Sequence, residues 1–189
     1  MPNNLIMRNS LRPFTSKLFI AFLLILPVFI QSCSETPDKF FGVAVLNTNT
    51  ITDFGTPILA KHINDETTEF ADIPSSKKKG NEALIYVQNN LLFMEKTLKD
   101  IKALSANDED RKDIKAEAIA LYEFVIPVYK NEYTAYAKLC DSKAPQERKD
   151  EIIKSIEQKY NAEFEKKQVS LHSKGKAFAD ENGLNVNWN

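Results

Sequence analysis

The most regular hydrophobic pattern in the chain runs over residues 82–105. Apolar residues recur there at alternating spacings of three and four, at Leu84, Val87, Leu91, Met94, Leu98 and Ile101. This spacing places all six on one face of an α-helix. Leu92, Phe93 and Leu104 widen that face. The pattern therefore predicts an amphipathic helix whose broad apolar side faces a core.

A second helix is predicted over residues 108–139, with Asn107 or Asp108 as its N-cap. Its apolar positions are Ile114, Ala118, Leu121, Val125, Val128 and Leu139. Pro127 lies in the middle of this stretch and removes one backbone hydrogen bond, so we expect a kink there.

The last helix is predicted to begin near Pro145 and to extend over about 37 residues. Its apolar positions are Ile152, Ile153, Ile156, Tyr160, Phe164, Leu171 and Phe178. Asn182 and Gly183 form a stop signal, because glycine readily adopts the left-handed conformation that ends helices.

Residues 43–70, from Val43 to Phe70, are harder to interpret, because Gly55 and Pro57 interrupt a loose helical spacing. Two helices are one solution, with Thr56 as the N-cap of the second and Pro57 at its first position. One long helix kinked near Pro57 is the other, and we favour it.

Helices joined by short loops run antiparallel to their neighbours. The four segments therefore predict an all-α fold, an up-down-up-down four-helix bundle covering residues 43–189. The chain contains neither an internal repeat nor a second domain boundary.

The N-terminal region has the organisation of an export signal over residues 1–32. Arg8, Arg12 and Lys17 give it a basic start, and an apolar run from Leu18 to Ile30 follows. Thirteen residues of helix span about 20 Å, less than the roughly 30 Å of hydrocarbon that a membrane-spanning helix must cross. We therefore prefer a cleaved signal peptide to an uncleaved anchor. Translation from Met1 or from Met7 gives an equally good signal.

The end of this signal resembles the lipobox of bacterial lipoproteins, with Ile30 in the aliphatic place, Ser32 in the small place and Cys33 in the invariant place. Gln31 stands where the pattern prefers a small residue. The resemblance implies cleavage before Cys33, a diacylglyceryl thioether on its sulfur and acylation (palmitate, for example) of its amino group. Several acyl chains hold a protein firmly at a membrane. An ordinary cysteine, paired with Cys140, is the alternative.

Residues 33–42 are then expected to be a lipidated, flexible tether. The resemblance extends to the position after the cysteine, where Ser34 is typical of lipoproteins sent to the outer membrane, on its periplasmic or its surface face. The helical remainder also resembles all-helical surface lipoproteins.

Composition narrows the possible functions of the mature chain. Removing the three basic residues of the signal from a total of 25 leaves 22 against 26 acidic residues, a net charge of −4. This mild acidity argues against nucleic acid as a partner. Only five glycines occur in the chain, which favours helices. Cys140 is the only cysteine after Cys33, so no disulfide framework is expected.

Motifs for chemistry are missing from the sequence. It contains neither the Glu-x-x-His pattern of di-iron bundles, nor Cys-x-x-Cys-His, nor a glycine-rich phosphate loop, nor a Gly-x-Ser-x-Gly elbow. We therefore expect no catalytic residue, cofactor or metal, and no enzyme. Two alternatives remain: a haem- or metal-binding bundle that uses His62 and His172, and an enzyme without a recognisable motif.

Tyrosines form a second stripe beside the apolar positions of the 108–139 helix. Tyr122, Tyr129, Tyr133 and Tyr136 are candidates for a binding surface, since tyrosine buries a large area at low entropic cost. Rings that edge the core with their hydroxyls in water are the alternative, and we prefer it. The sequence thus predicts a lipid-anchored, helical cell-envelope protein with a binding or structural role, for an unidentified protein or small ligand.

Overall fold

The computed structural model describes residues 35–188, so the expected signal peptide (1–32) and Cys33 lie outside the described residues. This part of the chain is all-helical and contains no strand. Its helical elements are α2 (Pro37–Ala44), η2 (Leu46–Ile51), α3 (Pro57–Asp65), η3 (Pro74–Ser76), α4 (Glu82–Ala103), α5 (Glu109–Val128), η4 (Tyr129–Tyr133), α6 (Thr134–Asp141), α7 (Gln146–Ile156), η5 (Glu157–Asn161) and α8 (Ala162–Glu181).

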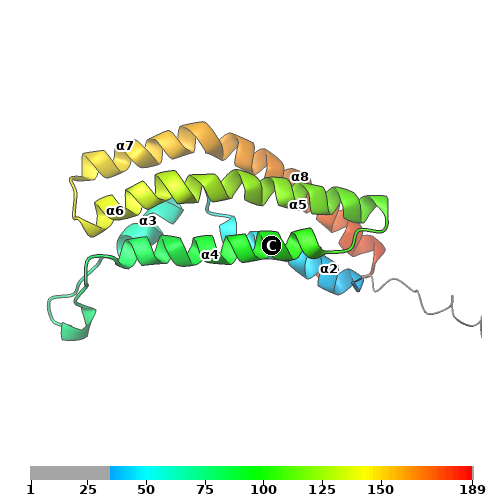
Figure 1. The fold of residues 1–189 in the computed structure, drawn as a ribbon, viewed down its shortest axis with the longest axis horizontal. Coiled ribbons are helices and arrows are strands. Elements are labelled where there is room, and N and C mark those ends of the chain that lie inside the picture. The colour runs from blue at the N-terminus through cyan, green and yellow to red at the C-terminus, as the bar shows by residue number, and fades with distance from the viewer. Residues whose placement is uncertain (1–34, 189) are drawn as a thin grey trace, which may run out of the picture. The chain divides into compact units, whose positions relative to one another are not determined.

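Long rods dominate the described region and confirm the three helices predicted most clearly. One rod is α4, the next runs through α5, η4 and α6, and the last through α7, η5 and α8. Consecutive rods run in opposite directions (Figure 1). The second rod packs on both of the others: α5 contacts α4 and α8, and α6 contacts α4 and α7.

Side chains at the turns fix where the rods begin and end. Asp108 caps α5, its carboxylate accepting a 2.8 Å hydrogen bond from the backbone N–H of Arg111. The carboxylate of Asp141 accepts 3.0 Å bonds from the N–H groups of Ala83 and Leu84, which ties the end of α6 to the start of α4. Gly183 adopts the left-handed conformation (φ 65°) just after α8, as the stop signal predicted.

The second rod does not end at Pro127. Helix α5 contains this proline, and the wide π-turn η4 follows directly. The hydroxyl of Thr134 donates a 2.9 Å bond to the carbonyl of Tyr129, satisfying a group within that irregular turn. A second π-turn, η5, interrupts the last rod between α7 and α8. The sequence pattern predicted neither π-turn.

The prediction of one long kinked helix over residues 43–70 is wrong. The structure instead has α2, the 3-10 helix η2 and α3 in this region. Gly55 separates η2 from α3 with a φ of 76°, a conformation in which side chains are strained. Pro57 then opens α3, as in the two-helix alternative, although Thr56 makes no side-chain capping bond.

The flexible tether expected over residues 33–42 is also wrong from Pro37 onward. Thr36 caps α2, and its hydroxyl accepts a 3.3 Å bond from the N–H of Lys39. Phe40 and Phe41 are both buried in the core. The folded domain therefore begins before residue 43, because the side chains of Phe40 and Phe41 belong to its core.

The apolar face of α4 is narrower than its sequence indicated. Val87, Met94 and Ile101 are buried, whereas Leu92 and Phe93 are exposed. Phe70, at the end of the segment predicted as one kinked helix, lies exposed in the connection before α4. None of the helices in the described part of the chain is both long and apolar enough to cross a bilayer. All the core side chains of residues 35–188 belong to one compact unit.

Candidate functional site

The four tyrosines proposed as a binding surface, Tyr122, Tyr129, Tyr133 and Tyr136, are buried, so that prediction is wrong. They lie on α5, η4 and α6, and their rings form part of the hydrophobic core. The spacing along the helix was recognised correctly. The preferred alternative, rings at the edge of the core with their hydroxyls in water, is correct for the buried rings but not for three of the hydroxyls, which bind backbone groups.

Three of the buried hydroxyls bind backbone groups of the N-terminal segment rather than water. Tyr122 donates to the carbonyl of Asn47 (2.9 Å), and Tyr136 donates to the carbonyl of Ala60 (3.2 Å). The hydroxyl of Tyr133 accepts a 2.9 Å bond from the N–H of Gly55. Burial raises the pKa of Tyr122 to about 12 and also raises the pKa of Tyr133 and Tyr136. These hydroxyls therefore remain protonated and hold residues 47–60 in place.

An aromatic cluster surrounds the buried ring of Phe54. Ring centroids lie 4.9–6.3 Å from Phe54 at four neighbours, Phe124, Tyr129, Tyr133 and Phe164. The hydroxyl of Tyr160 in η5 donates a 2.8 Å bond to Glu132 in η4, so the two π-turns face each other beside this cluster. Irregular turns of this kind often mark functional sites. Here η4 contributes two of the rings that lie beside Phe54, those of Tyr129 and Tyr133.

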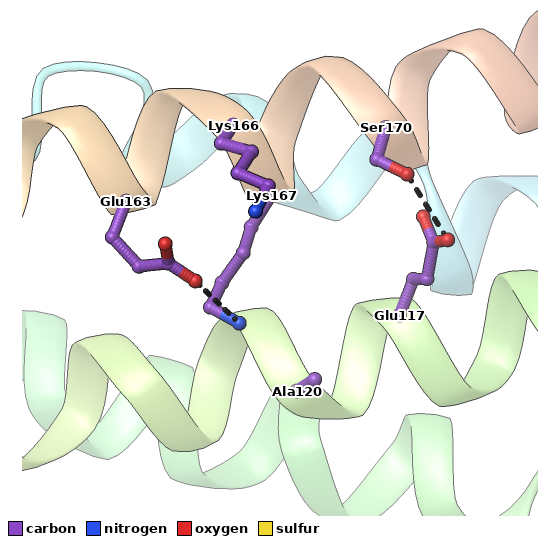
Figure 2. Close-up of a pocket in the computed structure, with 6 residues that line it drawn as sticks. All are labelled: Glu117, Ala120, Glu163, Lys166, Lys167 and Ser170. Atoms are coloured by element: carbon purple, nitrogen blue, oxygen red, sulfur yellow. Dashed lines mark hydrogen bonds and ion pairs between the residues drawn. The ribbon is translucent and has the colours of Figure 1, made fainter.

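A shallow groove lies between α5 and α8, with a volume of about 230 Å³. Figure 2 shows its lining: Glu117 and Ala120 from α5, and Glu163, Lys166, Lys167 and Ser170 from α8. Lys167 pairs with Glu163, four residues earlier on the same helix, at 3.2 Å. Ser170 donates to one carboxylate oxygen of Glu117 (3.1 Å), and the second oxygen, Oε2, is buried without a hydrogen-bond partner.

A second cleft, of about 560 Å³, separates α3 from α7. Pro57, Ala60, Tyr136 and Ile153 give it an apolar lining, and charged residues on both helices form its rim. The side chain of Tyr136 thus reaches a surface hollow, although the ring is almost completely buried. Neither hollow has a histidine or a cysteine among its lining residues.

Three carboxylates of the second rod, those of Glu117, Glu123 and Glu132, make separate interactions. Glu117 pairs with Lys174 (3.0 Å), Glu123 with Lys102 (2.7 Å), and Glu132 accepts the bond from Tyr160. Among residues 35–188, no group of three or more His, Cys, Asp or Glu side chains is placed to hold a metal ion.

The histidines and the cysteine occupy separate environments. His62 is exposed on α3, whereas His172 is half-buried on α8, with Nε2 3.4 Å from the hydroxyl of Thr48. Burial lowers the pKa of His172. Cys140 is buried and unpaired, and burial raises the pKa of its thiol. A raised pKa disfavours the thiolate that nucleophilic chemistry requires.

Comparison with known proteins adds no relative. No family model, no curated protein and no solved structure matches this chain. The loose apolar spacing of residues 43–70 included Phe54, but sequence reasoning missed the aromatic cluster around its ring and the unpaired oxygen of Glu117. The Phe54-Gly55-Thr56-Pro57 run did signal a break, but nothing in it shows that the ring before the break points into the core.

Proposed function

We propose that this chain is an exported bacterial lipoprotein, anchored through Cys33, whose helical domain has a binding or structural role in the cell envelope. The observation that carries the proposal is the run from Leu18 to Cys33: an apolar stretch too short to span a bilayer, followed directly by the lipobox-like Ile30-Gln31-Ser32-Cys33. The outer membrane is the expected destination, because Ser34 follows the cysteine.

The start of the domain supports direct attachment to the membrane surface. The carboxylate of Glu35 accepts a 2.9 Å bond from the N–H of Ser105, and Arg111 donates a 2.8 Å bond to the carbonyl of Glu35. Residue 35 is thus part of the folded unit, and two residues of chain reach at most about 7 Å. The lipid on Cys33 would hold the domain close to the headgroups, without a flexible spacer.

The proposal includes an up-down-up-down four-helix arrangement whose first rod is broken at Gly55. In its support, α2 contacts α4, α5 and α8, while α3 contacts α4 and α6. These contacts support counting the broken segment as the fourth rod.

The burial and the interactions of the reactive side chains favour a binding or structural role over catalysis. The thiol of Cys140 is buried, and the carboxylates of Glu117, Glu123 and Glu132 are engaged in separate interactions. A cofactor held by His62 and His172 gains no support, since one is exposed on α3 and the other lies beside Thr48.

Fractionation of bacteria that express the full chain tests the proposal. We expect the wild type in the membrane fraction and Cys33→Ser in the soluble fraction, because the variant has no sulfur to carry the diacylglyceryl group. Cys140→Ser serves as the matched control and should stay with the membranes. Retention of Cys33→Ser in the membranes would contradict the proposal. The lipoprotein resemblance further implies that Ser34→Asp moves the protein from the outer to the inner membrane.

A further inference from the structure

The loop that connects α3 to α4, residues 66–81, exposes two large apolar side chains. Phe70 is 57% exposed and Ile73 is 47% exposed. The hydroxyl of Ser76 accepts a 2.8 Å bond from the N–H of Phe70 and donates a 2.6 Å bond to the carbonyl of Ile73. The N–H of Ile73 in turn donates a 3.1 Å bond to the carbonyl of Phe70. These bonds hold the backbone of the loop in a conformation that leaves both side chains outside the core.

A lysine triplet, made of Lys77, Lys78 and Lys79, follows Ser76 directly. Within the described part of the chain, no ion pair or hydrogen bond involves the ammonium groups of the triplet. Residues 70–81 contain one carboxylate, that of Asp72, so their net charge is three minus one, or +2. The loop therefore joins an exposed apolar pair to three unpaired positive charges.

The other carboxylates near the triplet are engaged with the chain or lie at the far end of the loop. Glu69 accepts a 3.2 Å bond from the N–H of Lys78 and lies 3.9 Å from the ammonium group of Lys143. Glu82, in the first turn of α4, accepts bonds of 2.6 and 3.0 Å from two N–H groups at the end of the loop. Glu66 lies directly after α3. Lysine side chains are long and flexible, so the three ammonium groups can reach a surface that these shorter carboxylates do not reach.

We propose that this loop binds the headgroup layer of an anionic membrane, with Phe70 and Ile73 inserted among the headgroups and the lysine triplet on their phosphates. Exposed aromatic and aliphatic side chains next to lysines suit a surface that is apolar inside and negatively charged outside. A stable protein interface buries about 800 Å² on each partner, more than two apolar side chains supply. Asp72 lies between the two apolar residues in the sequence and opposes the contact, so its replacement by an amide should strengthen binding.

The choice of a membrane as the partner rests on the proposed lipid at Cys33, which holds the domain at a bilayer and makes a weak second contact sufficient. Glu35 is bonded into the fold, so this anchor attaches close to the start of α2. Figure 1 shows α2 below one end of α4 and the loop below the other end, whereas α5 and α7 lie above α4. Helix α4 has 22 residues and is about 33 Å long. A bilayer along this lower side therefore meets both the anchor and the loop, and α4 lies along the membrane surface.

A fluorescent label on the loop tests the contact. The mature protein, purified from bacterial membranes, is reconstituted on vesicles of phosphatidylcholine alone or mixed with anionic phosphatidylglycerol. An environment-sensitive fluorophore is attached to Ile73→Cys, since the native Cys140 is buried and a lipidated Cys33 has no free thiol. We expect its emission to rise several-fold and to shift to shorter wavelength on the anionic vesicles only. Val169→Cys, 68% exposed on α8, is the control position and should respond to neither kind of vesicle.

Charge variants of the labelled protein separate the lysine triplet from the total charge. The triple variant Lys77→Gln, Lys78→Gln, Lys79→Gln should lose the response, and high salt should weaken it in the wild type, because salt screens exposed charges. The matched control replaces three exposed lysines of the last rod by Gln, at Lys154, Lys159 and Lys166, and should keep the response. Asp72→Asn should increase it.

Equal signals on the neutral and the anionic vesicles, equal signals at residues 73 and 169, or a full signal in the triplet variant would each overturn the proposal. A label at residue 73 that responds to isolated cell envelopes but not to lipid vesicles would assign the loop to a protein partner and overturn it as well.

Flotation of the unlabelled wild type with the same vesicles separates this failure from that of the lipid anchor. A lipidated chain floats with both kinds of vesicle, so flotation with both and no signal at residue 73 refutes the loop contact alone. A chain that floats only with anionic vesicles refutes the anchor alone. A chain that floats with neither refutes both.

Discussion

Replacing Gly175 by alanine is the sharpest test of how the N-terminal segment packs. Gly175 lies within α8, and a β-carbon built on it would come within 2.8 Å of Cγ1 and 3.1 Å of Cγ2 of Val45. Val45 is itself buried and has a short, branched side chain, so it cannot move aside freely. The missing side chain of Gly175 thus provides the space in which residue 45 packs.

Two opposing effects set the size of the change. Alanine is favoured over glycine inside a helix by about 1 kcal/mol. Overpacking a tight core contact costs about 1–3 kcal/mol. We therefore expect Gly175→Ala to lower the free energy of unfolding by up to about 2 kcal/mol. Gly42→Ala is the matched control, because Gly42 is also helical and an added β-carbon there meets nothing within 4 Å. That variant should gain up to about 1 kcal/mol.

Thermal and urea unfolding of the two variants measures the difference. For a domain of this size, each kcal/mol shifts the melting temperature by about 2–4 °C. Gly42→Ala should melt slightly above the wild type, and Gly175→Ala several degrees below Gly42→Ala. If Gly175→Ala stabilised the protein as much as Gly42→Ala, residue 45 would not lie against α8, and the packing of the N-terminal segment described above would be wrong.

Two sets of substitutions and one change of pH should alter the free energy of unfolding. Tyr133→Phe leaves the buried N–H of Gly55 without its acceptor, so urea unfolding should show a loss of about 1–3 kcal/mol. Met94→Ala, in the core, should lose about 2–5 kcal/mol in the same assay, with a smaller loss for the half-buried Leu91→Ala; equal losses would contradict the burial pattern. Because burial raises the pKa of Tyr122 from 10.0 to about 12, the folded state holds this proton more tightly than the unfolded state. The resulting stability is fully present below pH 10 and lost as the pH rises from 10 to 12, by up to about 1.4 kcal/mol per pH unit. A free energy of unfolding that stays constant from pH 10 to pH 12 would mean that the hydroxyl of Tyr122 is solvated.

The long helices were predictable because their signal is local. Apolar spacing located α4 and the two rods that follow, and Asp108 and Gly183 marked ends that the structure confirms. The spacing determines which residues share a face. It does not determine how wide the covered face is, so Leu92 and Phe93 were wrongly assigned to the core.

The N-terminal segment and the tyrosines were not predictable, because their environment depends on contacts between distant parts of the chain. Tyr122 and Tyr133 bind backbone groups that lie 75 and 78 residues earlier in the sequence. Amphipathic tyrosine suits an exposed surface and a buried hydrogen bond equally well, so periodicity alone does not separate these outcomes. The apolar spacing likewise gives no sign of the π-turn η4, whose Tyr129 and Tyr133 pack beside the distant Phe54.

Mass spectrometry of the N-terminus of the native protein, purified from bacterial membranes, tests the central claim most directly. The account predicts a mature chain that begins at Cys33 and carries a diacylglyceryl group on its sulfur. An intact signal peptide, or an unmodified thiol at Cys33, would contradict it.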